Sequence, residues 1–107
     1  MSDLIQVVGA DSFSAETQSG VVLVDFFATW CRPCQMQMPI LEQIAPEFAG
    51  RAKIIKVDTD LAQNIALDFG IQNIPTLVVL KDGKKIAQFS GIQQSSTIRN
   101  ALEKALG

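Results

Sequence analysis

Histidine is absent from all 107 positions of the chain. Its absence excludes imidazole general bases, Ser-His and Cys-His nucleophile pairs, and zinc sites that need a ring nitrogen. Only two cysteines are present, too few for a four-thiolate zinc or iron-sulfur site within one chain, or for a disulfide-stapled secreted scaffold. We therefore expect no metal and no cofactor, and a reducing compartment.

An excess of basic residues is also missing. Nine Lys and Arg stand against 11 Asp and Glu, a net charge of -2, so little charge is available to displace counterions from a phosphate backbone. The longest apolar runs, Val21 to Val24 and Leu77 to Leu80, have four residues each, whereas a membrane span needs about 20. We expect neither a nucleic acid nor a membrane as a partner.

The first residues lack the features of a signal peptide. Asp3 stands where a signal peptide carries Lys or Arg, and Gly9 and Asp11 end the apolar stretch early. Neither repeats nor Ser/Gly/Pro-rich linkers divide the chain, and 48% hydrophobic residues suffice for one core but not two. The sequence thus predicts a single cytoplasmic domain over residues 1–107, which we expect to be monomeric.

Strands and helices alternate in the predicted order β-α-β-α-β-α-β-β-α. Residues 21–27 are β-branched and aromatic without alternation, as in a central strand buried on both faces. Asp82-Gly83 suits a two-residue hairpin turn. The pattern predicts a mixed α/β sheet with helices on both faces. The remaining expected strands are 4–8, 53–58, 76–81 and 84–89, and the expected helices are 11–18, 34–49, 60–70 and 95–106.

Several helix boundaries follow from individual side chains. Asp11 or Ser12 is expected to cap the first helix, and Asp60 the third, with Gln63 reaching back as in a capping box. Pro39 and Pro46 should bend the second helix, since proline lacks the N–H that a helix interior uses.

The two cysteines, Cys31 and Cys34, lie between the buried strand and the second helix. The first of them should face the free N–H groups and the positive dipole end of that helix, which favours a thiolate. Cys34 can then attack a mixed disulfide formed at Cys31. Two other interpretations remain: a structural staple, which would stabilise by only about 2 kcal/mol in so short a loop, and a metal site shared between two chains.

Further motifs accompany this pair across nearly the whole chain. They are V-D-F-F-A-T-W-C-R-P-C at 24–34, Pro39, K-V-D at 56–58, G-I-Q-N-I-P-T at 70–76, K-D-G at 81–83, and Gly91. In this combination the chain resembles the thioredoxin family. The resemblance implies a thioredoxin fold, a five-stranded mixed sheet flanked by four helices. It also implies a thiol-disulfide oxidoreductase that carries electrons to oxidised protein substrates and is recharged by a thioredoxin reductase.

The resemblance also assigns roles around the cysteines. Cys31 corresponds to the attacking nucleophile, Cys34 to the buried resolving thiol, and Asp25 to the carboxylate that transfers a proton to or from it, with Lys56 as its partner. Burial inside an apolar strand should raise the pKa of Asp25, as a general base at neutral pH requires. Alternatively, Asp25 and Lys56 form a structural ion pair, or Asp25 lies at a strand end in water.

Pro75 resembles the family's cis-proline, which would face the cysteines and leave the backbone at Ile74 and Thr76 free to pair with a substrate strand. The alternative is an ordinary trans-proline before a strand, because only about 5% of X-Pro bonds in folded proteins are cis. By the same resemblance, a flat substrate-binding patch surrounds the exposed sulfur. Singly, such apolar residues are more often core side chains. The patch would comprise Trp30, Ile74, Gly91 and Ile92.

The chain departs from the family pattern at Arg32, where a glycine usually separates the first cysteine from the proline. A guanidinium there favours the thiolate of Cys31, so we expect a potential tens of millivolts above the typical value of about -270 mV. Arg32, Pro33 and Pro75 are the expected redox-tuning residues. Alternatively, Arg32 points into solvent and only selects charged partners. The other departures are Phe27 for tryptophan, Asn73 for glycine and Gln35 for a basic residue.

Two further functions compete with disulfide reduction. One is a binding module that uses the same apolar face without redox turnover. The other is a disulfide donor or isomerase, which Arg32 alone favours and the lack of a signal peptide opposes.

Overall fold

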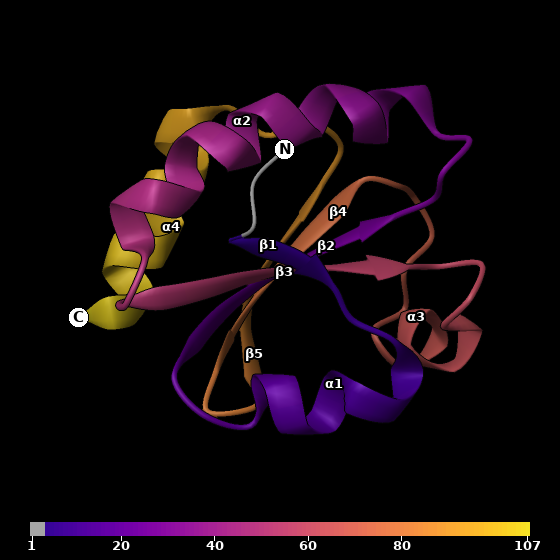
Figure 1. Cartoon of the computed structure of the whole chain (residues 1–107), viewed down its shortest axis with the longest axis horizontal. Coiled ribbons are helices and arrows are strands. Elements are labelled where there is room, and N and C mark those ends of the chain that lie inside the picture. Colours follow the sequence, from indigo (N-terminus) through magenta and orange to yellow (C-terminus); the bar gives the residue numbers. More distant parts are fainter. Residues whose placement is uncertain (1–3) are drawn as a thin grey trace.

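The strand predicted over residues 21–27 lies at the centre of the sheet in the computed structural model, which describes residues 4–107. Within that range the sheet has five strands in the order β1-β3-β2-β4-β5 (Figure 1). The first three of these are parallel, β4 runs antiparallel to β2, and β5 runs antiparallel to β4. The strands are β1 (Ile5–Val7), β2 (Val21–Phe27), β3 (Ala52–Asp58), β4 (Thr76–Lys81) and β5 (Lys84–Ser90).

Four helices cover the two faces of this sheet in the described residues (Figure 1). The helices α2 (Arg32–Phe48) and α4 (Ser95–Leu106) bury side chains such as Leu41 and Leu102 against one face. The helices α1 (Ala10–Thr17) and α3 (Gln63–Asp68) pack Phe13 and Ile65 on the other. The predicted architecture, a mixed sheet between two helical layers, is therefore confirmed.

Every residue of β2 is buried, so its alternating side chains supply both layers of core. Val22, Val24 and Phe26 face the α1 and α3 layer. Leu23 faces the α2 and α4 layer, and alternation places Asp25 on the same side. A carboxyl group thus lies inside the apolar layer beneath the second helix.

The predicted hairpin between β4 and β5 is confirmed. Asp82 and Gly83 both have positive φ, 51° and 83°, as a two-residue turn matching the twist of the strands requires. The Asp82 carboxylate also accepts a hydrogen bond from the Gly20 N–H at 2.8 Å. The turn is therefore stabilised by its own backbone conformation and by a hydrogen bond to the segment before β2.

Two predicted helix caps are wrong. Gly9 is the N-cap of α1, without a side-chain bond, and Asp11 lies in the first turn of the helix rather than before it. The third helix begins at Gln63 instead of near Asp60, and its N-cap is Ala62. No reciprocal capping box forms, because the Gln63 side chain donates to the carbonyl oxygen of Asp60, at 3.3 Å.

The Asp58 carboxylate holds the turn that precedes α3. It accepts from the N–H groups of Asp60 at 2.9 Å and Leu61 at 3.4 Å, in the turn that precedes α3. Asp58 ends β3, and its backbone carbonyl also accepts from the Ala62 N–H at 2.9 Å, so side chain and backbone together form this turn. Because of this turn, α3 begins at Gln63 and not near Asp60.

Helix α2 begins earlier than the predicted residue 34 because Pro33 is accepted in its first turn, where the missing N–H has no helical partner. It is also assigned without a break through Pro39 and Pro46 to Phe48, one residue before the predicted end. The bends expected at these prolines stay predictions.

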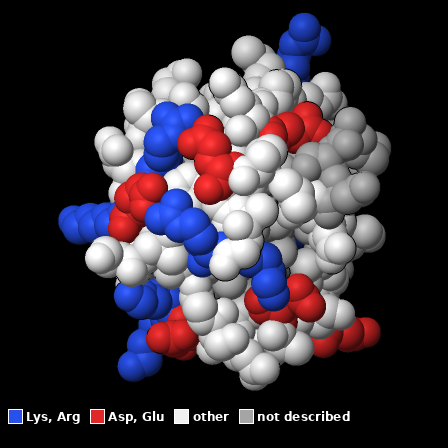
Figure 2. All heavy atoms as spheres, turned by 60° about the vertical axis from the view of Figure 1, so that its left-hand side comes forward, with Lys and Arg blue, Asp and Glu red and all other residues white. Residues whose placement is uncertain are grey.

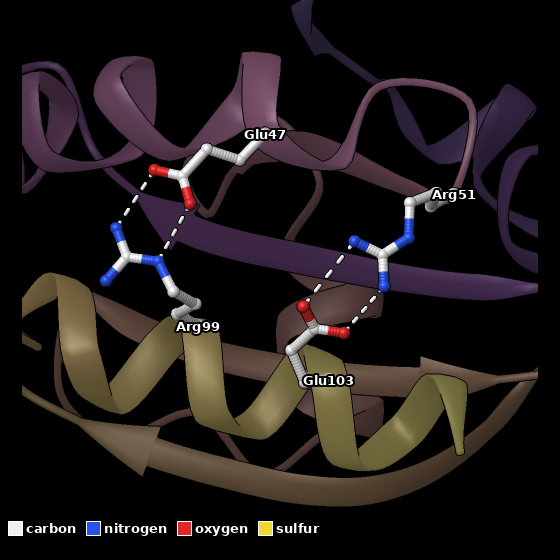
Figure 3. A network of polar contacts seen from close by, with 4 residues as sticks. All are labelled: Glu47, Arg51, Arg99 and Glu103. Carbon is white, nitrogen blue, oxygen red and sulfur yellow. Dashed lines mark hydrogen bonds and ion pairs between the residues drawn. The ribbon is translucent and has the colours of Figure 1, made fainter.

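Two bidentate ion pairs join α2 and the turn after it to α4 (Figure 3). Arg99 donates to Glu47 at 2.8 and 2.9 Å, and Arg51 donates to Glu103 at 2.6 and 3.5 Å. Figure 2 shows the surface on the side of α4, where basic and acidic side chains are interspersed. No helix among residues 4–107 is long and apolar enough to cross a membrane.

Candidate active site

The cysteine pair lies where β2 passes into α2. Cys31 is the N-cap of the helix and Cys34 is in its first turn, and the two form a disulfide with Cα atoms 5.3 Å apart. The Cys34 N–H donates to the Cys31 sulfur at 3.2 Å. The first sulfur therefore sits at the positive end of the helix dipole, as predicted, where a thiolate is stabilised.

Both cysteines are buried in this oxidised state, Cys31 at 4% and Cys34 at 3% exposure. The expectation of an exposed first sulfur is therefore not met here. The pair packs with Phe27 and Ala28, at and just after the end of β2, and Ile74 packs against the same cluster.

Asp25 lies in β2, the strand that leads to the cysteine segment, on the sheet face that packs under α2 and α4, and it has no exposed surface. Among the described residues, neither of its carboxylate oxygens has a hydrogen-bond partner. Burial raises the pKa of Asp25 from 3.8 to about 7, against the opposing effect of the Lys56 charge. An orphaned carboxyl that titrates near neutral pH can take up or release a proton.

Lys56 is the strand neighbour of Asp25 in the register between β2 and β3. Its ammonium lies 4.3 Å from the ring centre of Phe27, a cation–π contact, and makes no hydrogen bond to Asp25. Lys56 therefore acts on Asp25 through its charge and not as a contact ion pair. The aromatic ring at position 27, a departure from the family pattern, holds that charge in place.

A cleft of about 220 Å³ opens beside this group and is lined by Phe27, Cys34, Met38 and Lys56, among others. Cys34 is otherwise closed off from solvent. The cleft therefore brings solvent next to the second cysteine.

The Ile74–Pro75 peptide bond is cis, as the resemblance implied. The carbonyl oxygen of Ile74 lies 3.8 Å from the Cys31 sulfur, so this loop borders the disulfide directly. Thr76 is buried and lies in the sheet between Phe26 and Ser90, so it is less accessible than Ile74.

The remaining predicted patch residues lie next to Cys31 in the chain or next to the Ile74–Pro75 loop. Trp30 precedes Cys31 and is 70% exposed. Gly91 donates its N–H to the Pro75 carbonyl at 2.8 Å, with a φ of 81° that favours glycine, and Ile92 follows half-buried. The structure thus brings together the segments that carry Trp30, Ile74 and Ile92, which are far apart in the sequence.

Arg32 is exposed in the first turn of α2 and makes no hydrogen bond or ion pair within residues 4–107. Its guanidinium is thus available to an incoming anionic group beside Cys31.

Sequence reasoning missed Asp60 and Gln37. The Asp60 carboxylate accepts from the indole N–H of Trp30 at 2.8 Å, and the Gln37 amide bonds the backbone of Gln93. Both partners lie 30 or more positions away in the chain. Only the polarity of Gln37 among the apolar positions of α2 could have signalled its role.

Comparison with known proteins agrees with this geometry. The Thioredoxin family model matches residues 4–104. Thioredoxins of Staphylococcus aureus strains Mu50 and MW2 are each 41% identical over 103 residues, covering 96% of this chain and 98% of theirs. The crystal structure of a Malassezia sympodialis thioredoxin superposes with a TM-score of 0.85 at 34% identity, covering 96% of this chain and 91% of that one. The chain therefore belongs to the thioredoxin family, and its Cys31–Cys34 pair makes it a thiol-disulfide oxidoreductase.

Proposed function

We propose that this oxidoreductase works in the reducing direction, on disulfides of oxidised proteins, and that a thioredoxin reductase returns its disulfide to the dithiol. The observation that carries the proposal is the cysteine pair at a helix N-terminus, together with an orphaned, proton-accepting carboxyl in the strand that leads to it. As stated from the sequence, we further propose a single monomeric domain in the cytoplasm that needs no cofactor of its own.

The reaction begins with the Cys31 thiolate attacking one sulfur of a substrate disulfide. A mixed disulfide forms, and the other substrate sulfur leaves as a thiolate that takes a proton from solvent. The Cys34 thiol then loses its proton to the Asp25 carboxylate, and its thiolate attacks the Cys31 sulfur. The second substrate sulfur leaves and is protonated, so the substrate gains two electrons and the chain ends as the Cys31–Cys34 disulfide.

Asp25 suits the second step because its pKa of about 7 leaves a comparable share of both protonation states at neutral pH. Lys56 opposes the full effect of burial and keeps this pKa from rising further. The cleft is lined by Cys34 and by Lys56, the strand neighbour of Asp25, and so brings water next to the thiol that gives up its proton.

Substrate binding is assigned to the residues around Cys31. We propose that Trp30, Ile74, Gly91 and Ile92 contact the polypeptide on either side of the substrate cystine, and that the Ile74 backbone pairs with it as an added strand. The same role for the Thr76 backbone requires its pairing with Phe26 or Ser90 to open, since Thr76 is buried between them.

The first test is the equilibrium potential of the Cys31–Cys34 pair, measured by thiol alkylation across a graded dithiol/disulfide buffer. A two-electron midpoint between about -280 and -220 mV supports a reductase. A midpoint above about -180 mV would instead support the donor or isomerase function, for which the free Arg32 beside Cys31 is the specific observation.

A second test separates catalysis from binding. The double substitution Cys31→Ser/Cys34→Ser should abolish reduction of insulin disulfides by dithiothreitol-recharged protein. The Pro46→Ala variant, exposed at the far end of α2, serves as the control that retains turnover. Full biological complementation by the double serine variant would favour the binding module.

A further inference from the structure

Gln37 is a polar side chain at a fully buried position of α2. It lies one turn after Cys34 and has no exposed surface, whereas the neighbouring buried positions of the helix, Leu41 and Ile44, are apolar. A buried amide is costly unless both its N–H₂ and its oxygen find partners. The partners of Gln37 therefore indicate what the residue does.

Both ends of the amide bond the backbone of a single residue, Gln93. The Gln37 oxygen accepts from the Gln93 N–H at 2.7 Å, and its nitrogen donates to the Gln93 carbonyl at 3.0 Å. This pairing imitates a short piece of sheet between the cysteine helix and the loop after β5. It fixes both the position and the orientation of that loop, which one hydrogen bond would not.

The Gln93 side chain extends the connection towards the cysteines. It donates to the carbonyl oxygens of Ser90 at 3.0 Å and Gly91 at 3.2 Å. The Gly91 N–H in turn donates to the Pro75 carbonyl at 2.8 Å. Hydrogen bonds thus run from α2 through residues 90–93 to the loop whose Ile74 carbonyl borders the Cys31 sulfur.

The loop needs such support because it lies outside the regular elements. The sheet ladder ends at Ser90 and α4 begins at Ser95, so residues 91–94 have no strand partner. Without the Gln37 amide, the Gln93 N–H and carbonyl would have no other partner among the described residues. A loop without these bonds would adopt several conformations and so several positions relative to Cys31.

We infer that Gln37 is a positioning residue for disulfide exchange. It holds residues 91–93 in the position, relative to Cys31, at which a protein substrate binds. The inference rests on the proposed function, since it takes Gly91 and Ile92 as substrate contacts. The hydrogen bonds of the Gln37 amide go to Gln93 and not to a sulfur, so its loss weakens binding of protein substrates and leaves the chemistry of the cysteine pair unchanged.

The decisive variant is Gln37→Met, which keeps the volume and removes both hydrogen bonds. With the reduced protein in single-turnover experiments, we expect the half-saturating concentration of oxidised insulin to rise about two- to tenfold at an unchanged limiting rate. The rate with dithiodipyridine, too small to contact the loop, should stay within about twofold of the unsubstituted protein, and the Gln93 N–H should exchange with deuterium faster.

Gln43→Met is the matched control, because it makes the same change on the same helix at an exposed position. It should change none of these quantities. The inference is overturned if Gln37→Met binds insulin as tightly as the unsubstituted protein, or if its rates with insulin and dithiodipyridine fall together.

Should Gln37→Met not fold, Gln37→Asn decides the question. It keeps a polar amide but shortens the side chain by one methylene, so the amide no longer reaches both the N–H and the carbonyl of Gln93. A rise in the half-saturating concentration of insulin alone supports the inference, and no rise overturns it. If the unsubstituted protein reduces neither disulfide, the proposed function fails instead.

Discussion

Asp25 shows how one buried side chain can cost stability and still serve the reaction. Its carboxyl is enclosed in the apolar layer under α2 without a hydrogen-bond partner in the described structure. Such a group destabilises the fold when charged, which a purely structural residue would not do. Its proposed role in proton transfer supplies the reason for keeping it.

Asp25→Asn should therefore stabilise the oxidised protein in a pH-dependent way. The carboxyl loses its proton near pH 3.8 when unfolded and near pH 7 when folded, so the folded state holds the extra proton between these values. Stability of the unsubstituted protein consequently falls as the pH rises from about 4 to about 7 and levels off above. The variant lacks this loss, and at pH 8 it should be more stable by at most about 4 kcal/mol.

Urea unfolding followed by far-UV circular dichroism at pH 4 and pH 8 measures this difference. At pH 4 both proteins should unfold at closely similar urea concentrations, because the carboxyl is protonated in the folded state. Equal stability at pH 8 as well would show that Asp25 titrates near its ordinary pKa.

Arg32 is a second residue whose effect can be isolated. Its guanidinium lies in the first turn of α2 beside Cys31 and is bound to nothing within residues 4–107, so its charge adds to the helix dipole in favouring the thiolate. Arg32→Gly should lower the midpoint potential by tens of millivolts, since about 1.4 kcal/mol corresponds to 30 mV. An unchanged midpoint in the graded redox buffer would leave Arg32 a role in substrate docking only.

At the scale of elements, α2 and α4 are joined in two different ways. The buried Gln37 amide fixes the loop before α4 near the cysteines, and the two ion pairs join the helices further along (Figure 3). Hydrogen bonds from the Arg99 guanidinium lower the pKa of Glu47, as expected for a bidentate pair. Both pairs are exposed, so they orient the helices more than they stabilise them.

A double-mutant cycle on Arg51→Gln and Glu103→Gln measures the second pair. Their side chains are about half exposed, so a coupling free energy of about 0.5 kcal/mol is expected from urea unfolding. The cycle cancels the contact of Arg51 with the Phe48 ring, which the single substitution also loses. In 1 M NaCl the coupling should shrink towards zero, and a coupling that salt leaves unchanged would contradict a screened surface pair.

For the whole molecule, the disulfide links the redox state to stability. Closing a loop of four residues restricts the unfolded chain by about 2 kcal/mol, so the oxidised protein should be the more stable form. Thermal unfolding should then show a Tm on the order of 10 °C higher for the disulfide than for the dithiol. As the control, Cys31→Ser/Cys34→Ser should have the same Tm in oxidising and in reducing buffer. A dithiol form at least as stable as the disulfide form would refute the expectation.

The order of elements could be predicted because it depends on neighbouring residues. The unbroken apolar run of β2, the Asp82-Gly83 turn and the stripe of apolar residues in α4 each encode their structure locally. The position of the cysteine pair at the start of α2 could be predicted for the same reason, because the pair lies in the chain between a strand and a helix. Helix caps were predicted less well, since Asp58 holds the turn before α3 and the Asp60 carboxylate accepts from the distant Trp30 indole instead of capping the helix.

The sequence by itself determined the α/β architecture and the redox chemistry, because both arise from residues close together in the chain. The tertiary structure alone decided that Lys56 rests on Phe27 rather than on Asp25, that Asp60 holds Trp30, and that Gln37 pairs with Gln93. These contacts form between segments that only folding brings together. Their partners depend on the register of strands and on the burial of polar atoms, which no local pattern of residues specifies.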